Sequence, residues 1–469
     1  MIRFGTGGWR AVIGDEFTKE NIQILAQAMA SKMKDEKVDG SGIVMGYDRR
    51  FLSKEAMQWA SEVFAANGIK AKLINKSCPT PLVMYYVMEN DLPYGMMITA
   101  SHNPAVYNGV KVFTGGGRDA DETQTAQIEE YISDVALPVP AENYDDAKAA
   151  GLIDEFYPIN DYLDAIINKI DIVAIRNAGL KAALDPMYGV AENAIKTILL
   201  TARCEVETIH GMHDTLFGGK LPAPNAAAME PLKTCVIDKH CDIGIATDGD
   251  ADRIGIVDDK GRYITPNDIL VMLYYYLKKY RGETGPVVRN ICTTHMLDRI
   301  AARYGEVCYE VPVGFKHISA RISETDALIG GESSGGLTVR GHINGKDGVY
   351  AAALLVEMLA VTGCRMSEIY DEITREFGSL YMEECNCTFR PEQRAAYEKR
   401  LMEDREIPEL PFETDRVSYI DGCKVYFKCG GWVCTRFSGT EPLLRIFCEM
   451  PEREQAEQVC NIYKEFLDL

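Results

Sequence analysis

Short apolar runs alternate with amphipathic helical patterns through the first 140 residues, and this alternation constrains the possible folds most strongly. Residues 43–47, 95–99 and 110–113 have the character of buried strands. Thr18 occupies an N-cap position before apolar residues 22, 25, 26 and 29, which recur at helical spacing. Strands that alternate with helices indicate βαβ units, so the sequence predicts a largely parallel sheet covered by helices.

The rest of the chain continues in blocks, because 469 residues are too many for one hydrophobic core. We expect a strand at 242–246, a helix at 268–280 and a buried helix at 349–360. After about residue 377 the pattern favours strands, including 425–428 and 432–435. Two segments rich in Pro, Asp and Glu, 134–150 and 403–416, are predicted to be solvated connections.

Composition excludes several classes of function. The net charge of -20 argues against general binding to nucleic acid or to anionic membranes. We find no apolar run near the roughly 20 residues that a membrane span needs, and the first residues lack the apolar core of a secretion signal. The 14 cysteines are irregularly spaced without a Cys-x-x-Cys pair, so we expect reduced, mostly buried thiols in a cytoplasmic protein.

An acidic motif at residues 248–253 carries the clearest chemistry. Asp248, Asp250 and Asp252 alternate with small residues and can converge on one hard cation, for which Mg²⁺ or Ca²⁺ is suitable. A calcium-binding EF-hand loop is the rival, but Arg253 occupies the position that needs glycine, and the flanks look like strands. We therefore predict a magnesium site, with Arg253 placed to neutralise a bound phosphate.

Thr-Ala-Ser-His-Asn-Pro at residues 99–104 follows a predicted strand directly. Ser101 would then lie at the carboxyl end of an open α/β sheet, where such sheets bind ligands. Ser, Asn and Pro also favour turns, and taken alone the motif fits a capped turn better than a reactive serine. Lys111 follows soon after and adds a cation that can return to the same place.

Gly-Gly-Glu-Ser-Ser-Gly-Gly at residues 330–336 combines backbone freedom with a carboxylate and hydroxyls, which suits the reading of sugar hydroxyl groups. A flexible turn is the plain alternative. The segment also matches the nucleophile elbow of serine hydrolases, but no acid lies between Ser333 and the one downstream histidine, His342. We therefore exclude a hydrolase of that type.

Arg436 and Arg445 bracket a Ser-Gly-Thr turn at residues 438–440. In so acidic a chain, two guanidinium groups around a glycine-containing loop favour a phosphate site over a solvated loop. Arg10 ends another glycine loop, and Lys316 is predicted to lie on a loop at 314–317. A degenerate dinucleotide fingerprint at residues 115–120 falls inside a block rather than opening one, so NAD binding is not expected.

Together and in this order, these motifs resemble those of the α-D-phosphohexomutase superfamily, which includes phosphoglucomutases, phosphomannomutases and phosphoglucosamine mutases. The resemblance implies an α/β fold of four domains around a central cleft, with three related α/β domains and a smaller α+β domain at the C-terminus. The implied domains are residues 1–150 with the phosphoserine loop, 151–258 with the magnesium loop, 259–375 with the sugar-reading loop and 376–469 with the phosphate-binding loop.

The resemblance also implies roles for single residues. Ser101 would carry the phosphoryl group and join the three aspartates around one Mg²⁺ per chain. Arg10 and His102 would lie near the transferring group, and Lys111 and Lys316 would carry protons. Contacts with the substrate would come from Arg253, Glu332, Ser334, Arg436, Ser438, Gly439, Thr440 and Arg445. The partners would be small sugar phosphates, with a hexose 1,6-bisphosphate as intermediate and activator, and the chain would be a monomer or a homodimer.

Departures from the family pattern bear on the substrate. Gly7 replaces a serine common in the first loop, and Ser333 stands at a position that varies with the sugar. Gly336 and the Gly-Phe-Lys stretch at 314–316 are glucose-type, so we predict a phosphoglucomutase. Phosphomannomutase and phosphoglucosamine mutase are the alternatives within the family. A catalytically silent sugar-phosphate-binding protein and a metal-dependent phosphatase are the alternatives outside it.

Overall fold

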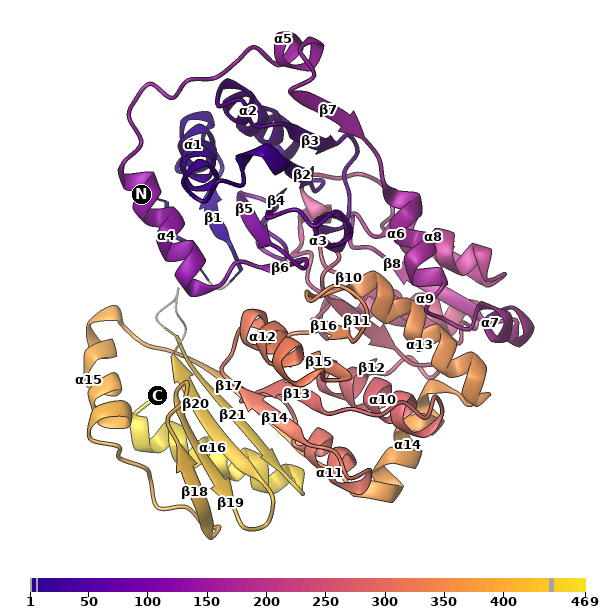
Figure 1. Cartoon of the computed structure of the whole chain (residues 1–469). Helices are drawn as coiled ribbons and strands as arrows, with labels where there is room; N and C mark the ends of the chain where they lie inside the picture. The colour runs from indigo at the N-terminus through magenta and orange to yellow at the C-terminus, as the bar shows by residue number, and fades with distance from the viewer. Residues whose placement is uncertain (1, 6, 438–442) are drawn as a thin grey trace. The chain divides into compact units, whose positions relative to one another are not determined.

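The computed structural model describes residues 2–5, 7–437 and 443–469, and its described strands form four sheets (Figure 1). The chain divides into two compact units. The first contains residues 1–269 and 334–367, and the second contains residues 270–333 and 368–469.

The first sheet of the first unit has the strand order β1-β5-β4-β2-β3-β7, with β6 paired to β5. Its strands are β1 Trp9–Val12, β2 Ile43–Tyr47, β3 Ala71–Ile74, β4 Tyr94–Ile98, β5 Tyr107–Thr114, β6 Arg118–Asp119 and β7 Ile153–Phe156. The helices of this region are α1 Lys19–Asp35, α2 Ser53–Ala66, α3 Thr80–Glu89, α4 Glu122–Ser133 and α5 Tyr144–Ala149, with a short 3₁₀ turn η1 Asp39–Ser41.

The prediction of a largely parallel sheet holds for only part of this sheet. β2 pairs in parallel with β3 and β4, and β3 with β7, whereas β5 runs antiparallel to β4 and β1. The reason is the link from β4 to β5, which is a short loop without a crossover helix, so the chain must turn back. β2 joins β3 through α2, and β3 joins β4 through α3, so the two parallel crossovers run in opposite directions along the sheet. α2 and α3 therefore cover opposite faces (Figure 1).

The second sheet, also in the first unit, has the order β12-β11-β10-β8-β9. Its strands are β8 Lys181–Asp185, β9 Glu205–Thr208, β10 Ile243–Thr247, β11 Ile254–Val257 and β12 Tyr263–Ile264. The accompanying helices are α6 Ile159–Ile167, α7 Ile172–Ala178, α8 Glu192–Thr201 and α9 Glu230–Lys239, with a 3₁₀ turn η2 Phe217–Gly219. The predicted strand at 242–246 is confirmed within one residue.

α13 Gly348–Thr362 packs in the first unit against α7, α8 and β11. It is buried from residue 348 to residue 359, as its continuous Ala, Leu and Val content predicted. The short strand β16 Leu337–Val339 lies in the same unit. Among the described residues no single helix is long and apolar enough to cross a bilayer. Only α13 and α14 Met366–Phe377, which are bent against each other, reach the required length and apolar composition when they are taken together.

The second unit contains a parallel arrangement of β14, β13 and β15 and a separate antiparallel sheet. The parallel part consists of β13 Val287–Asn290, β14 Cys308–Val311 and β15 Ile329–Gly331, with the helices α11 Met296–Arg303 and α12 Phe315–Thr325. α10 Pro266–Lys279 confirms the helix predicted at 268–280, except for its last residue.

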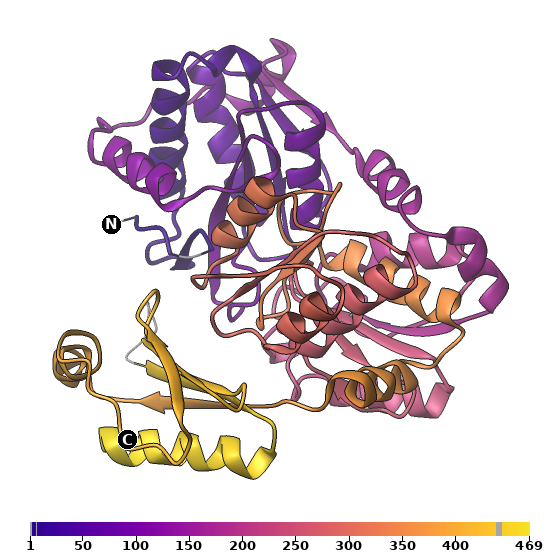
Figure 2. The same ribbon diagram turned by 60° about the horizontal axis from the view of Figure 1, so that its bottom comes forward.

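The antiparallel sheet has the order β17-β21-β20-β19-β18, and α16 Arg453–Leu467 packs along one of its faces (Figure 2). Its strands are β17 Tyr381–Thr388, β18 Thr414–Ser418, β19 Cys423–Phe427, β20 Trp432–Phe437 and β21 Leu443–Met450. Smaller elements are α15 Arg394–Glu398, the 3₁₀ turn η3 Pro391–Gln393 and the π-helical turn η4 Lys399–Glu403. This α+β arrangement confirms the fold class expected for the C-terminal part of the chain.

Some local predictions were wrong. The segment 134–150 contains α5, whose N-cap Asn143 accepts hydrogen bonds from the first-turn amides, and β18 begins inside 403–416. Both segments are rich in charged residues, so their composition predicted loops and did not indicate α5 or β18. The expected burial of most cysteines is confirmed, since all fourteen are free thiols and only Cys429 is exposed.

Candidate active site

Ser101 lies just beyond the carboxyl end of β4, and only 1% of it is exposed. Its backbone has φ 51°, in the left-handed region that a residue with a side chain adopts at an energetic cost. The neighbouring strand is β2, and the chain leaves β2 toward β3 but leaves β4 toward β5, on opposite sides of this strand pair. Ser101 therefore occupies the switch point at which open α/β sheets bind ligands.

Arg50, which the sequence analysis did not single out, holds the loop of Ser101 in this conformation. Its guanidinium group is buried and donates hydrogen bonds to four carbonyl oxygens, those of Ser101, Asn103, Pro104 and Tyr107, at 2.6–3.0 Å. Its Nε lies 3.3 Å from Asp48, which also accepts a hydrogen bond from Thr99. The sequence signal that could have indicated Arg50 is Asp-Arg-Arg at residues 48–50, which follows a predicted strand in a very acidic chain.

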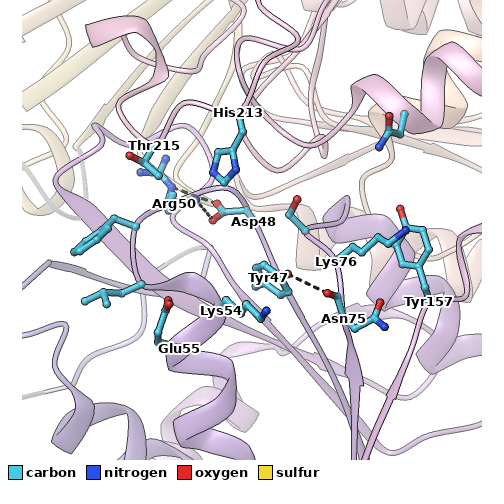
Figure 3. Close-up of a pocket in the computed structure, with 14 residues that line it drawn as sticks. Tyr47, Asp48, Arg50, Lys54, Glu55, Asn75, Lys76, Tyr157, His213 and Thr215 are labelled. Atoms are coloured by element: carbon cyan, nitrogen blue, oxygen red, sulfur yellow. Dashed lines mark hydrogen bonds and ion pairs between the residues drawn. The ribbon is translucent and has the colours of Figure 1, made fainter.

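Asp48 and Arg50 also form part of the wall of a cavity of about 550 Å³ (Figure 3). Tyr47 lies at the same wall and donates to the carbonyl of Asn75, and Lys76 lies over the ring of Tyr157 at 4.8 Å. The cavity thus reaches the residues that support the Ser101 loop, although Asp48 and Arg50 are themselves buried.

The three predicted metal ligands converge in the loop between the antiparallel strands β10 and β11. One oxygen from each of Asp248, Asp250 and Asp252 lies within 4.8 Å of the others, and all three side chains are buried. Ser101 Oγ donates to Asp248 Oδ2 at 2.8 Å, which joins the two strongest sequence motifs in one site. Gly249 is required here, because a Cβ at this position would lie 2.8 Å from the carbonyl oxygen of Ser101.

Two lysines offset the charge of this triad. Lys111 Nζ lies 2.6 Å from both Asp250 and Asp252, and Lys346 Nζ lies 2.9 Å from Asp252. Burial disfavours the charged form of Asp252, but the ion pairs with Lys111, Lys346 and Arg253 outweigh burial and hold the pKa of Asp252 well below its usual range. Lys346 was missed from sequence because a single lysine far along the chain shows no pattern.

The donor set fits a hard divalent cation. Asp250 Oδ1 and Asp252 Oδ1 are buried and have no hydrogen-bond partner among the described residues. Burial and the adjacent Asp250 and Asp252 raise the pKa of Asp248 well above its ordinary value, and a bound cation would favour its ionised form. Three carboxylates without nitrogen or sulfur ligands match the preference of Mg²⁺.

Arg10, His102 and Arg253 lie around the same serine. His102 Nδ1 is 3.3 Å from Ser101 Oγ, and burial together with Arg253 and Arg10 lowers the pKa of His102, which keeps the imidazole neutral. Arg10 donates to Asn103 of the serine loop. Arg253 Nε lies 4.0 Å from Asp248 and 3.9 Å from Asp252, and the Arg253 amide donates to Asp248 at 3.1 Å. Three predicted residues thus meet near Ser101.

In the second unit, Glu332 follows β15 and is held by two donors. Its Oε1 accepts from Asn290 Nδ2 at 3.1 Å and from the Gly314 amide at 2.9 Å. Ser334, assigned to the first unit, is exposed. Lys316 does not lie on a loop as predicted, because α12 begins at Phe315 and places Lys316 in its first turn. The glycine at 314, which suggested a loop, is instead the N-cap, with φ 125°.

The predicted phosphate clamp lies on β20 and β21. Arg436 and Arg445 are directly opposite each other across these antiparallel strands. Like charges at such positions repel, and Asp421, 2.9 Å from Arg436 Nε, offsets part of this charge. Arg445 Nε is buried and has no hydrogen-bond partner among the described residues. Ser438, Gly439 and Thr440, also predicted for this clamp, lie outside the described residues.

Models of the phosphoglucomutase/phosphomannomutase domains match almost the whole chain. Alpha/beta/alpha domain I matches residues 1–137, domain II residues 160–261 and domain III residues 265–377. The C-terminal domain matches residues 390–464.

Named relatives match over the full length. A phosphoglucomutase/phosphomannomutase of Thermococcus kodakarensis is 27% identical over 98% of this chain and 97% of its own. A phosphoglucosamine/phosphogalactosamine mutase of Sulfurisphaera tokodaii is 26% identical over 99% of both chains. A phosphoglucomutase of Komagataeibacter xylinus is 28% identical over 96% of this chain and 87% of its own.

Solved structures match as well. A Thermus thermophilus protein classed with the phosphomannomutases is 27% identical and has a TM-score of 0.87, over 100% of this chain and 99% of its own. The open form of parafusin, a phosphoglucomutase from Paramecium, is 21% identical and has a TM-score of 0.83, over 99% of this chain and 94% of its own. The second match supports the fold alone.

Proposed function

Because this chain belongs to the phosphoglucomutase/phosphomannomutase family of α-D-phosphohexomutases, we propose that Ser101 is its phosphoryl carrier and that glucose is its preferred hexose. The reaction would interconvert the 1-phosphate and the 6-phosphate of the sugar through a hexose 1,6-bisphosphate. The observation that carries the proposal is the 2.8 Å contact between Ser101 Oγ and Asp248 in a buried cluster of three carboxylates.

The backbone around Ser101 supports a role in group transfer. The backbone of Ser101 has a left-handed conformation, which the buried Arg50 holds in place through its hydrogen bonds. In this conformation Ser101 Oγ points toward the carboxylate cluster. Such strain persists only where the surroundings impose it, and it is common at reactive positions. The capped-turn interpretation of the motif explains neither the strain nor the four hydrogen bonds from Arg50.

In the proposed step, the bond between the phosphorus of phosphoserine and Oγ breaks while a bond from phosphorus to a sugar hydroxyl oxygen forms. The hydroxyl proton leaves toward a proton carrier, for which Lys316 is our candidate, and Ser101 returns to a hydroxyl by taking a proton. Bound Mg²⁺ would be held by Asp248, Asp250 and Asp252 and would supply charge compensation for the transferring group.

Lys111 is better suited to electrostatic compensation than to the proton transfer proposed from sequence. Burial lowers the pKa of Lys111, but its ion pairs with Asp250 and Asp252 outweigh burial and raise the pKa above its ordinary value. A lysine that holds its proton so firmly is a poor base at neutral pH. We therefore assign Lys111 and Lys346 to balancing the carboxylates.

Arg436 and Arg445, with residues 438–440, would grip the phosphate that is not being transferred. Glu332 and Ser334 would fix the ring through its hydroxyl groups. After the first transfer the bisphosphate would turn end over end, so the same grip must accept either phosphate. This requirement favours recognition of phosphate geometry over fine sugar detail.

The preference for glucose depends on Gly336 and on the Gly-Phe-Lys stretch at 314–316. A second candidate is a phosphoglucosamine mutase, because a relative named phosphoglucosamine/phosphogalactosamine mutase matches along the whole chain. The deciding experiment compares turnover of glucose, mannose and glucosamine 1-phosphates with Mg²⁺ and a trace of the matching 1,6-bisphosphate. We expect glucose 1-phosphate to be converted fastest, and faster conversion of either other sugar would overturn the preference.

Release of inorganic phosphate in the same assay separates a mutase from a phosphatase. A mutase transfers the phosphoryl group to sugar and should release almost none. A silent sugar-phosphate-binding protein would bind the substrates without converting any of them.

A further inference from the structure

Glu332 depends on two anchors, and a single turn of the C-terminal sheet touches the peptide next to each of them. The anchors are the Asn290 side chain and the Gly314 amide, which both donate to Glu332 Oε1. What we call the turn is the bend at residues 421–422 together with the first two residues of β19, Cys423 and Lys424. Lys424 Nζ donates to the carbonyl of Ile291 at 2.5 Å, and Asp421 Oδ2 accepts from the Val313 amide at 2.9 Å.

The same turn holds Arg436. The Nε of Arg436 donates to both carboxylate oxygens of Asp421, at 3.0 and 2.9 Å. Gly422 keeps the turn close to β20, since its φ is 99° and a Cβ there would lie 2.3 Å from the carbonyl oxygen of Thr435. Asp421 therefore contacts β20 through Arg436. Through the Val313 amide it contacts the segment next to Gly314, whose amide donates to Glu332.

Lys424 makes this attachment rigid. It is 1% exposed, it pairs with Glu310 at 2.8 Å, and it lies 4.0 Å from the centre of the Trp432 ring. Separating a buried charge from a carboxylate, a carbonyl oxygen and an aromatic ring costs a large amount of free energy. The turn is thus fixed to β13 by Lys424 and to the start of α12 by Asp421.

We propose that Asp421 is a positioning residue that sets Arg436 and Glu332 in one fixed register. The inference rests on the proposed function, in which Arg436 holds a phosphate and Glu332 reads the ring. A hexose phosphate that spans both side chains then depends on Asp421 through two connections. A ligand that reaches only Arg436 and Arg445 depends on Asp421 through one connection, the contact with Arg436.

The test measures binding by calorimetry in the full-length protein, with glucose 1-phosphate and with inorganic phosphate as the two probes. Four proteins are compared: wild type, D421N, E332Q and the double variant. D421N should weaken glucose 1-phosphate about tenfold, the scale of one charge-assisted hydrogen bond, and inorganic phosphate by clearly less. In the double variant the loss for glucose 1-phosphate should be at least about threefold smaller than the product of the two single losses.

D415N is the matched control, because Asp415 is an exposed carboxylate on β18 of the same sheet. It should bind both probes as wild type does. D421E provides a second variant: its carboxylate can still pair with Arg436 but is too long to meet the Val313 amide in the same position. It should restore inorganic phosphate binding and leave glucose 1-phosphate weakened.

Losses that multiply in the double variant, or equal weakening of both probes by D421N, would overturn the proposal. Recovery of both probes by D421E would do so too. The binding cycle does not require turnover, so a protein that shows the coupling but converts no sugar refutes only the proposed function. A wild-type protein that binds no hexose phosphate refutes both.

Discussion

The region around Ser101 and the region around Glu332 handle charge in opposite ways. Near Ser101 three buried carboxylates crowd together, two of their oxygens remain without hydrogen bonds among the described residues, and the backbone is strained. Near Glu332 one carboxylate oxygen accepts hydrogen bonds from two neutral donors, and Arg436 has a partner in Asp421. In the proposed function a cation and a phosphoryl group would complete the first region, whereas Glu332 and Arg436 already have partners within the protein.

This contrast separates chemistry from recognition. Electrostatic stabilisation of a transferring group needs charges that the protein alone leaves uncompensated. Recognition of a substrate that must bind in two orientations needs a fixed geometry, because ordering flexible groups would weaken binding. Substitutions near Ser101 should therefore act mainly on kcat, and substitutions near Glu332 mainly on binding.

The largest effect should come from Arg50. R50M removes all four hydrogen bonds to the Ser101 loop while leaving the substrate-binding residues untouched. We expect kcat to fall about 100-fold, the scale of a misplaced reacting group, with KM for glucose 1-phosphate nearly unchanged.

The control is R49M, because Arg49 donates to the carbonyls of Tyr188 and Gly211 and does not touch the loop. Steady-state kinetics on both variants, with thermal melts to confirm folding, decide the matter. If R50M mainly raised KM, the proposed separation between the two regions would fail.

Mg²⁺ should stabilise the region around Ser101 selectively. At a concentration one hundredfold above its dissociation constant, Mg²⁺ should add about 2.7 kcal/mol to stability and raise Tm by several degrees. D250N should abolish that gain, whereas D238N, on the exposed end of α9, should keep it. Differential scanning fluorimetry with and without Mg²⁺ makes the measurement, and an equal gain in D250N would contradict the assigned metal ligands.

The residues in these predictions differ in whether the sequence alone could identify them. Ser101 and Asp248 were predictable as partners only through the resemblance of their motifs to the family, because β4 and β10 belong to different sheets. Arg50 and Lys346 were not, because Arg50 acts on backbone carbonyls and Lys346 contacts Asp252 from a distant part of the chain. For Lys316 the chemistry could be guessed but the helix could not, since a glycine N-cap and a glycine loop look alike in sequence.

Acid should destabilise the second unit through His295. Burial and the cations Arg289 and Lys424 lower the pKa of His295 to about 3, although Glu310 and Asp298 also face it and oppose the shift. Because the unfolded chain takes up this proton near pH 6.5 and the folded one resists it, stability falls as pH drops from about 6.5 toward 3.

The expected loss is about 2 kcal/mol between pH 6.5 and pH 5 from this residue alone. H295Q should therefore lose less Tm over that interval than wild type, and H240Q, which alters an exposed histidine, should behave like wild type. An unchanged acid sensitivity in H295Q would contradict a buried neutral His295.

The central claim is that Ser101 carries the phosphoryl group, and mass spectrometry of the protein tests it most directly. After incubation with Mg²⁺ and glucose 1,6-bisphosphate, we predict a single phosphoryl group on the peptide that contains Ser101. That group should be lost when excess glucose 1-phosphate is added, and S101A should show neither the modification nor turnover. Full mutase activity in S101A, or turnover without phosphate on Ser101, would contradict the account.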